Sequence, residues 1–279
     1  MMTFCLCALL ILWSGKILVE KHSPATQLLA GKTALVTGAA NRIGAQIART
    51  LHQNGANLII HHRHSSGNKS QESSHNAQAL EAELNSHRPG SSVRYQAELS
   101  DTTDIESLAQ NSIQAFGQLD ILVNNASSFY PTPLGLITEQ HWTELLGSNL
   151  KAPLFLSQAC YPALKESNGC IINLLDIYAT SPLKNHSLYC CAKAANQMLV
   201  KSLASDMAPE VRINGIAPGA ILWPEVDQND LEQQSILDKI PLQKMGNLDN
   251  ITQAVLFLIN NDYITGEVIT IDGGRLLNN

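Results

Sequence analysis

Three residues near the middle of the chain have side chains that could handle protons. Asp176 ends the apolar run "GCIINLLD", and Tyr189 and Lys193 follow it after a polar loop. Tyr189 and Lys193 are four residues apart, so they would share one face of a helix. A free tyrosine has a pKa of about 10, which a nearby ammonium should lower into a range useful for acid–base catalysis. Either these are ordinary surface residues, or an acid and an activated phenol share one site.

The composition of the chain limits which partners are expected. The 279 residues are 44% hydrophobic, which is enough for one large domain with a buried core. The formal net charge of −6 and the sequence pI of about 5.8 argue against nucleic-acid or anionic-membrane binding. None of the six cysteines forms a C-x-x-C pair, and Cys160, Cys170 and Cys191 lie in apolar or helical-looking surroundings. We therefore expect buried free thiols in a reducing, cytoplasmic compartment, without disulfides or metal.

The first 26 residues differ from the rest of the chain. Their apolar stretch "FCLCALLILW", residues 4–13, is shorter than the ~20 residues that a membrane-spanning helix needs. It has the length of a signal-peptide core, but no Lys or Arg precedes it and no clear cleavage site follows. A nonfunctional upstream extension is the preferred interpretation, and a weak membrane anchor and a secretion signal are the alternatives. The folded domain is accordingly expected to cover residues 27–279.

Short apolar runs alternate with longer segments of helical periodicity from residue 32 onward. Strands are expected within residues 33–38, 56–62, 91–99, 119–127, 169–176, 211–219 and 266–274, and helices within residues 42–55, 68–87, 101–117, 139–167 and about 186–207. Apolar strands that alternate with helices indicate a parallel sheet covered on both faces. The sequence predicts a single doubly wound α/β domain. Residues 219–247 look irregular, and a loop of that length is usually functional, so residues 220–246 are expected to form a substrate lid.

A glycine-rich turn, "TGAANRIG", follows the first expected strand and opens the first expected helix. A helix N-terminus in this place can hold a pyrophosphate. Gly38 would permit the tight turn, and Gly44 would let the helix approach the sheet. Arg42 stands where a third glycine would ordinarily be expected. An arginine at a helix start opposes the helix dipole, so its presence is more sensible if Arg42 meets an anion.

The second expected strand ends in "HHRHSS", residues 61–66, without an acidic residue. A fold that prefers NAD would carry an Asp or Glu there to bind the ribose 2′-hydroxyl. Arg63 with His62, His64 and Ser65 would instead bind a 2′-phosphate. A polar loop with scattered histidines is the alternative. The pattern favours NADPH as the cofactor.

Five short motifs occur in a fixed order along the chain: "TGAANRIG", "NNAS" (residues 124–127), Asn149 in "GSNLKAP", "YCCAK" (residues 189–193) and "APG" (residues 217–219). Together they resemble the short-chain dehydrogenase/reductase superfamily. The resemblance implies a Rossmann-like sheet of about seven strands and a homo-tetramer. It also implies that Asn149 supports a water-linked proton path and that Lys193 binds the nicotinamide ribose. The implied cofactor contacts are Gly38, Arg42, Ile43, Gly44, Glu98, Leu99, Asn125, Ala126, Ser127, Tyr189, Lys193, Pro218 and Gly219.

Within the superfamily, three departures resemble the pteridine reductases: Arg42, Ser127 in place of the usual glycine, and Asp176 in place of the usual serine. This resemblance implies that Phe129 stacks on a pterin ring opposite the nicotinamide. Arg42, Ser127, Asp176 and Tyr189 would surround the polar edge of the ring, and Trp223 would belong to the lid.

The expected reaction is NADPH-dependent reduction of a dihydropterin or dihydrofolate to its tetrahydro form. Such a reaction adds hydride to carbon and a proton to nitrogen, and the carboxyl of Asp176 beside a phenol can hold or relay that proton. Burial should raise the pKa of Asp176, although Lys193 should act in the opposite direction. The alternatives are a carbonyl reductase of the same fold, acting on 3-oxoacyl or sugar substrates, and a non-catalytic NADPH-binding sensor.

Overall fold

The computed structural model of the chain describes residues 27–63, 68–223 and 230–278. Its centre is a seven-stranded parallel sheet in the order β3-β2-β1-β4-β5-β6-β7. The strands are β1 Thr33–Val36, β2 Asn57–Arg63, β3 Ser92–Ala97, β4 Ile121–Asn124, β5 Cys170–Leu174, β6 Arg212–Pro218 and β7 Val268–Ile271. The expected Rossmann-like doubly wound sheet is therefore confirmed.

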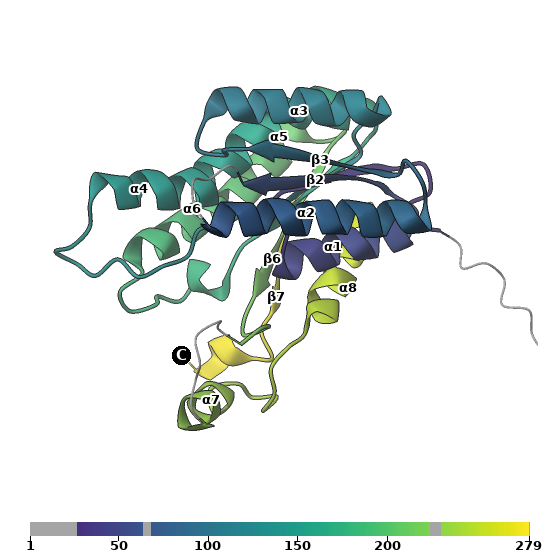
Figure 1. The fold of residues 1–279 in the computed structure, drawn as a ribbon. Coiled ribbons are helices and arrows are strands. Elements are labelled where there is room, and N and C mark those ends of the chain that lie inside the picture. The colour runs from purple at the N-terminus through teal and green to yellow at the C-terminus, as the bar shows by residue number, and fades with distance from the viewer. Residues whose placement is uncertain (1–26, 64–67, 224–229, 279) are drawn as a thin grey trace, which may run out of the picture.

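Helices cover both faces of this sheet. They are α1 Arg42–Gln53, α2 Asn68–His87, α3 Thr102–Phe116, α4 Glu139–Leu146, α5 Ala152–Glu166, α6 Ser187–Met207, α7 Asp230–Leu237 and α8 Leu248–Asn260. Figure 1 shows α3 and α5 on one side of the sheet and α1, α2 and α8 on the other. Since successive strand residues point to opposite faces, Ala34 and Val36 pack into the core of one side and Leu35 into the other.

Three shorter helical segments complete the described chain. They are the π-helical turn η1 Gly147–Lys151 and the 3₁₀ turns η2 Ile177–Ala179 and η3 Arg275–Asn278. The helical pattern expected within residues 139–167 did not indicate η1, where the chain changes from α to π winding between α4 and α5. π turns of this kind frequently occur at functional sites. The one in this chain carries Asn149.

The segment expected to be irregular, residues 219–247, contains helix α7. Figure 1 shows α7 and the C-terminal turn together, beyond the end of β7. The expected lid thus includes a helix rather than loop alone, and residues 224–229 of it lie outside the described residues. Helix α8, which the sequence analysis did not assign, follows and packs beside α1.

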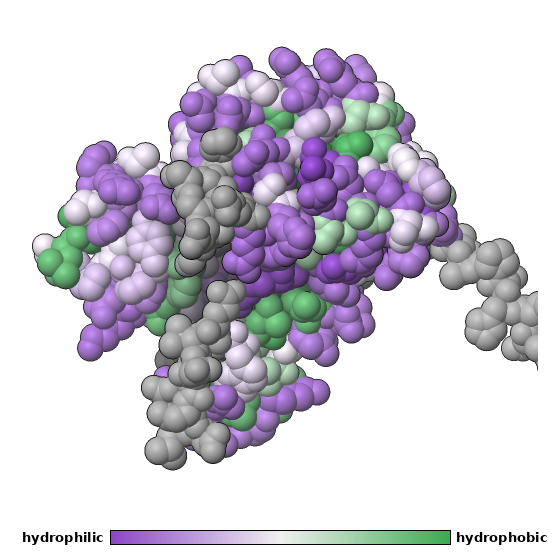
Figure 2. Space-filling view, viewed as in Figure 1, coloured by the Kyte–Doolittle hydropathy of each residue, from purple (hydrophilic) through white to green (hydrophobic). Residues whose placement is uncertain are grey.

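Of the cysteines within the described residues, two are buried as expected, and Cys5 and Cys7 lie outside those residues. Cys160 and Cys170 are buried and free, and burial raises the pKa of the Cys160 thiol to about 12 and that of Cys170 to about 11. Cys191, which was expected to be buried, is exposed because it lies on the outer face of α6. The face of the molecule seen in Figure 2 is mostly hydrophilic. Among the described helices, none is long and apolar enough to span a membrane.

Candidate active site

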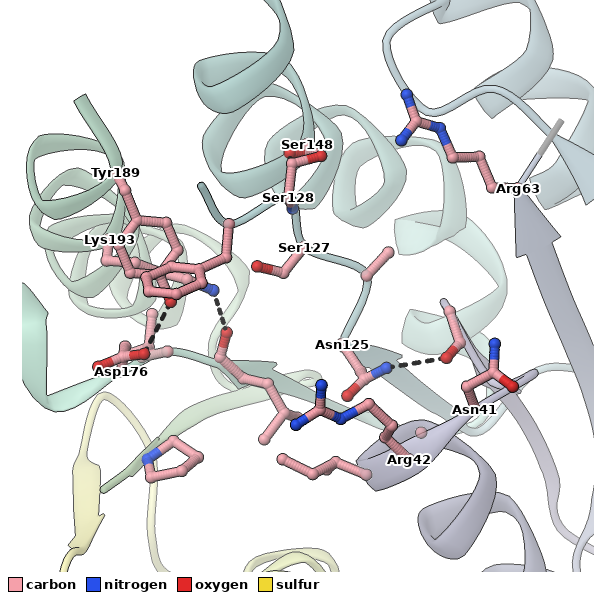
Figure 3. Close-up of a pocket in the computed structure, with 18 of the residues that line it drawn as sticks. Asn41, Arg42, Arg63, Asn125, Ser127, Ser128, Ser148, Asp176, Tyr189 and Lys193 are labelled. Carbon is pink, nitrogen blue, oxygen red and sulfur yellow. Dashed lines mark hydrogen bonds between the residues drawn. The ribbon is translucent and has the colours of Figure 1, made fainter. Parts of the chain in front are cut away.

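A cavity of about 1180 Å³ lies at the carboxyl ends of the strands. It opens where β1 pairs with β2 on one side and with β4 on the other, the point at which the chain order in the sheet reverses. Open α/β sheets bind ligands at such a point. Figure 3 shows residues of both predicted halves around one space: Arg42, Asn125 and Arg63 on one side, and Asp176, Tyr189 and Lys193 on the other.

The glycine turn forms the floor of the nucleotide half. Gly38 has a φ of +62°, which favours glycine, and its N–H donates to Nδ1 of His61 at 3.1 Å. A Cβ on Gly44 would collide with the backbone oxygen of Gly38, so only glycine allows the two segments to approach this closely. The side-chain amide of Asn125 donates to the backbone oxygen of Thr37 at 2.8 Å and holds the turn to the end of β4. This cradle fits the pyrophosphate of a dinucleotide.

Arg42 begins α1 and lines the cavity, as expected. Its φ is +52°, a left-handed conformation that glycine adopts most easily. This explains why the sequence pattern calls for glycine at this position. A non-glycine residue in this region is strained by about 1–3 kcal/mol, and such strain tends to occur at functional sites.

At the end of β2, one residue that was expected to bind the 2′-phosphate of the cofactor points away from the cavity. His62 is buried, its pKa is lowered by burial, and it does not line the cavity, so the structure does not place it for phosphate binding. His61 lines the cavity instead, because neighbouring strand residues point to opposite faces. Burial lowers the pKa of His61 to about 4, so its ring is neutral and serves as an acceptor for the glycine turn. His64 and Ser65 lie outside the described residues.

Arg63 also lines the cavity, and its side chain is 51% exposed. It forms ion pairs with Glu98 at 3.4 Å and with Glu144 at 3.6 Å. The carboxylate of Glu98 also accepts from the hydroxyl of Ser100 at 3.1 Å. A phosphate at this point would therefore share the guanidinium with two carboxylates.

Asp176 and Tyr189 meet at the catalytic end of the cavity. The Tyr189 hydroxyl donates to Oδ2 of Asp176 at 2.7 Å, and the backbone N–H of Tyr178 donates to Oδ1 at 2.9 Å. Figure 3 shows the first of these contacts beside Lys193. The Lys193 ammonium is buried and donates to the backbone oxygen of Leu174 at 2.9 Å. The expected grouping of acid, phenol and ammonium is thus present in three dimensions.

The proton affinities of these groups differ in part from the expectation. Burial raises the pKa of Asp176, and Lys193 acts in the opposite direction, as predicted. The pKa of Tyr189 is raised as well, by burial and then by the charge and hydrogen bond of Asp176. The prediction that Lys193 lowers it is therefore wrong for this state of the site, because the carboxylate is the nearer charge. Burial also lowers the pKa of Lys193 to about 8.

Asn149 is held rigidly by its π turn. Its side-chain amide donates to the backbone oxygens of Ser128 at 2.9 Å and Leu145 at 3.0 Å, and it accepts from the Ser127 hydroxyl at 2.9 Å. Its backbone oxygen accepts from the side chain of Asn196 at 2.8 Å. The sequence analysis did not predict this last contact, which occupies the backbone oxygen of Asn149 from inside the protein.

A chain of buried amides leads from this contact into the sheet. Asn196 accepts from Asn173 at 2.8 Å, and Asn173 accepts from Asn124 at 2.9 Å. All three side chains are buried, so each amide depends on its neighbours for its hydrogen bonds. This chain ties β4, β5 and α6 to η1 and fixes the position of the π turn.

Of the two further aromatic residues expected to contact the substrate, Phe129 lines the cavity and Trp223 does not. Phe129 lines the cavity and is 54% exposed. One face of its ring stacks on His186, with centroids 4.8 Å apart, and its ring meets Tyr189 edge-on at the same distance. Trp223 is 39% exposed and is not among the described residues that line the cavity. The remaining predicted contacts Ile43, Leu99, Ala126, Ser127, Pro218 and Gly219 all line it.

Sequence reasoning did not single out Tyr178 and Arg275, which line the cavity, whereas Ile236 and Met245 belong to the expected lid. Tyr178 follows Asp176 by two residues, and the spacing alone gives no reason to place it in a site. Arg275 lies almost at the C-terminus, in "GGRLLNN", and its charge among uncharged residues was the only available signal. Among the described residues, no cluster of His, Cys, Asp and Glu could hold a metal ion.

The fold and this site define a reductase-type oxidoreductase, and the chain belongs to the short-chain dehydrogenase/reductase superfamily. Residues 38–275 match the family model described as enoyl-(acyl carrier protein) reductase. Pteridine reductase 1 of Leishmania tarentolae is 32% identical over 286 residues, which cover 88% of this chain and 96% of that protein.

Other relatives are named for different activities. The 3-oxoacyl-(acyl-carrier-protein) reductase FabG of Thermotoga maritima is 30% identical, over 89% of this chain and 99% of its own. A solved structure assigned to the short-chain alcohol dehydrogenases, from Sinorhizobium meliloti 1021, superposes with a TM-score of 0.82 and 28% identity. The match covers 91% of this chain and 100% of that one. Membership in the superfamily therefore leaves the choice of substrate to the site itself.

Proposed function

We propose that this protein reduces a dihydropterin or dihydrofolate ring to its tetrahydro form with NADPH. The observation that supports this most directly is the buried carboxyl of Asp176, 2.7 Å from the hydroxyl of Tyr189. Reductases of this superfamily that act on carbonyl groups usually have serine at the position of Asp176. A carboxyl can supply a proton to a ring nitrogen and accept hydrogen bonds from N–H groups, whereas a hydroxyl is better suited to a carbonyl oxygen.

The residues of the site divide the proposed reaction between them. Reduction of a C=N bond adds hydride to carbon and a proton to nitrogen, and a bound nicotinamide cofactor supplies the hydride. The O–H of Tyr189 gives its proton to the ring nitrogen, and Asp176, whose pKa is raised by burial, replaces that proton when it is itself protonated. The buried Lys193 ammonium stabilises the phenolate while it lasts.

Phe129 supports the assignment of a flat, aromatic-like substrate. One face of its ring is covered by His186, so a substrate ring would stack on the other face. The edge contact between Phe129 and Tyr189 places that stacking surface beside the proton donor. A planar bicyclic ring would thereby present its edge to Asp176 and Tyr189.

NADPH is proposed over NADH because β2 ends in Arg63 without an acidic residue of its own. Glu98 and Glu144 form ion pairs with the same guanidinium, so the expected preference for NADPH over NADH is not a strong one. The ratio of kcat/KM for NADPH to that for NADH tests this directly. A ratio near one would refute the proposal for the phosphate.

A 3-oxoacyl reductase is the second candidate, because the FabG relative matches almost as much of the chain at a similar identity. One experiment separates the candidates: cofactor oxidation with dihydrobiopterin, dihydrofolate and a 3-oxoacyl thioester, measured side by side on the full chain. Turnover of the pterins supports the proposal. Robust activity on the thioester with none on the pterins would overturn it, and no oxidation with any substrate would favour a non-catalytic NADPH-binding protein.

A homo-tetramer and a cytoplasmic location complete the proposal. The free thiols of Cys160 and Cys170 are in keeping with a reducing compartment. Light scattering of the purified chain tests the assembly, and a mass of one or two chains would refute the tetramer.

A further inference from the structure

The C-terminal turn places an arginine in the wall of the cavity. Gly273 and Gly274 have φ values of +65° and +86°, and the carboxylate of Asp272 accepts from the backbone N–H groups of Gly274 and Leu276, both at 2.8 Å. Glycine adopts these left-handed conformations readily, and the two hydrogen bonds to Asp272 hold the turn in place. Arg275 begins η3 from this turn and lines the same cavity as Asp176.

The guanidinium of Arg275 is only partly used by the protein. Its Nη2 donates to the hydroxyl of Tyr178 at 3.1 Å, and the group lies 5.9 Å from the centroid of that ring. Its Nε is buried and has no hydrogen-bond partner among the described residues. The nearest acid in sequence, Asp272, uses its carboxylate for the backbone of its own turn. A buried donor without a partner is unfavourable unless a ligand satisfies it.

Arg275 is separated from the catalytic pair by a single residue of the cavity wall. Tyr178 contacts Arg275 through its hydroxyl and Asp176 through its backbone N–H. The positive charge of Arg275 also acts to lower the pKa of Asp176, although burial raises that pKa overall. No ion pair joins Arg275 to Asp176 among the described residues, so the guanidinium lies near the carboxyl without neutralising it.

The cavity that Arg275 lines also contains apolar side chains, among them Leu222, Ile236 and Met245. Electrostatic attraction is stronger in such an environment than in water. A guanidinium held in a fixed position recognises carboxylates and phosphates, because its planar N–H donors match the geometry of these groups.

We infer that Arg275 is a specificity-determining residue that binds an anionic substituent on the substrate. A ring placed against Phe129 and Tyr189 has Arg275 within reach of a side chain attached to that ring. The substituent is a carboxylate, as on the glutamate of dihydrofolate, or a phosphate, as on a phosphorylated dihydropterin. The choice of these substrates rests on the proposed function, whereas the anion site rests on the contacts of Arg275 alone.

The test compares Arg275→Gln and Arg275→Lys with the wild-type enzyme on three substrates: dihydrofolate, dihydroneopterin phosphate and dihydrobiopterin, which has no anionic group. A hydrogen bond to a charged group contributes about 1.5–3 kcal/mol, so Arg275→Gln should lower the ratio of kcat/KM for the anionic over the neutral substrate about 10- to 100-fold. Arg275→Lys should keep part of this preference. Lys201→Gln, an exposed change of equal charge on α6, is the matched control and should leave the ratio unchanged.

The pattern of loss identifies the ligand and can overturn the inference. Loss confined to dihydrofolate indicates a carboxylate, and loss confined to the phosphorylated pterin indicates a phosphate. An unchanged ratio in Arg275→Gln refutes the inference. Equal loss on all three substrates with a shifted pH profile also refutes it, because Arg275 would then act through Asp176.

A binding measurement separates this inference from the proposed function. Titration calorimetry with p-aminobenzoylglutamate, which carries the carboxylates without the pterin ring, needs no turnover. If the wild type reduces no pterin but binds this probe and Arg275→Gln does not, the proposed function fails and the anion site stands. If neither protein binds the probe and no substrate ratio changes, the anion site is refuted.

Discussion

Replacing Asp176 by asparagine removes the acid while keeping its size. The asparagine oxygen can still accept from the backbone N–H of Tyr178, which in the wild-type protein donates to Oδ1 of Asp176 at 2.9 Å. Its NH₂ group would face the hydroxyl of Tyr189, where Oδ2 now accepts at 2.7 Å. The substitution therefore removes both a proton source and the acceptor that orients the phenol.

The expected loss follows from this geometry. A positioned proton donor contributes about 10²- to 10⁴-fold to a rate, which corresponds to about 3–5 kcal/mol of transition-state stabilisation. We expect kcat for dihydrobiopterin to fall within that range in Asp176→Asn, while NADPH still binds, as measured by quenching of protein fluorescence. Asp176→Ser should lose pterin reduction as well.

The same substitution should make the variant more stable relative to wild type as the pH rises. Burial raises the pKa of Asp176 in the folded state, so folded protein holds this proton more tightly than unfolded protein does. By linkage, the favourable contribution is complete below the unfolded pKa of about 4 and is lost as pH rises through the folded pKa. Asparagine cannot titrate, so the melting temperature of Asp176→Asn relative to wild type should rise over that interval and stay higher at neutral pH.

Two results would refute this reasoning. If kcat/KM for dihydrobiopterin stays within a factor of about three of wild type, Asp176 does not handle the proton, since even a weak general acid contributes more. If the difference in melting temperature between variant and wild type does not change with pH, the carboxyl is not desolvated as the structure indicates. Measurement of both in the same buffers keeps the two outcomes separate.

Three further substitutions test other parts of the site. Gly44→Ala should destabilise the fold by about 1–3 kcal/mol in chemical denaturation and weaken NADPH binding, because its Cβ would collide with the backbone of Gly38. Gly147→Ala is the control, since it has room for the new methyl group and should change little. Arg63→Ala should raise the KM for NADPH more than that for NADH, and an equal effect on both cofactors would argue against a phosphate contact. Asn196→Ala should lower the free energy of unfolding by about 2–6 kcal/mol, because it leaves the backbone oxygen of Asn149 and the side-chain NH₂ group of Asn173 without partners. A thermal stability equal to that of wild type would contradict the role of the buried amide chain.

Local patterns in the sequence were enough to predict the architecture. Apolar runs long enough for strands alternate with segments of helical period, and a parallel sheet covered on both faces is the arrangement that buries both. Helix α2 has the bounds expected from the sequence, and α3 begins where its helical pattern begins, with Asp101 as its cap accepting from the N–H of Thr103 at 2.7 Å. The four-residue spacing also predicted that Tyr189 and Lys193 share one helix face, whereas the placement of Asp176 beside them was expected from the family resemblance.

The tertiary structure decided what the sequence could not express. Which histidine enters the cavity depends on the register of β2, and a shift of one residue exchanges His61 with His62. The proton affinity of Tyr189 depends on which charge is closer in space, and Asp176 is closer than Lys193. Arg275 reaches the site only because β7 ends beside β6 and the following turn leads back over the cavity. Sequence determined which groups could do chemistry, and packing determined which of them meet, because burial and distance are properties of the folded chain alone.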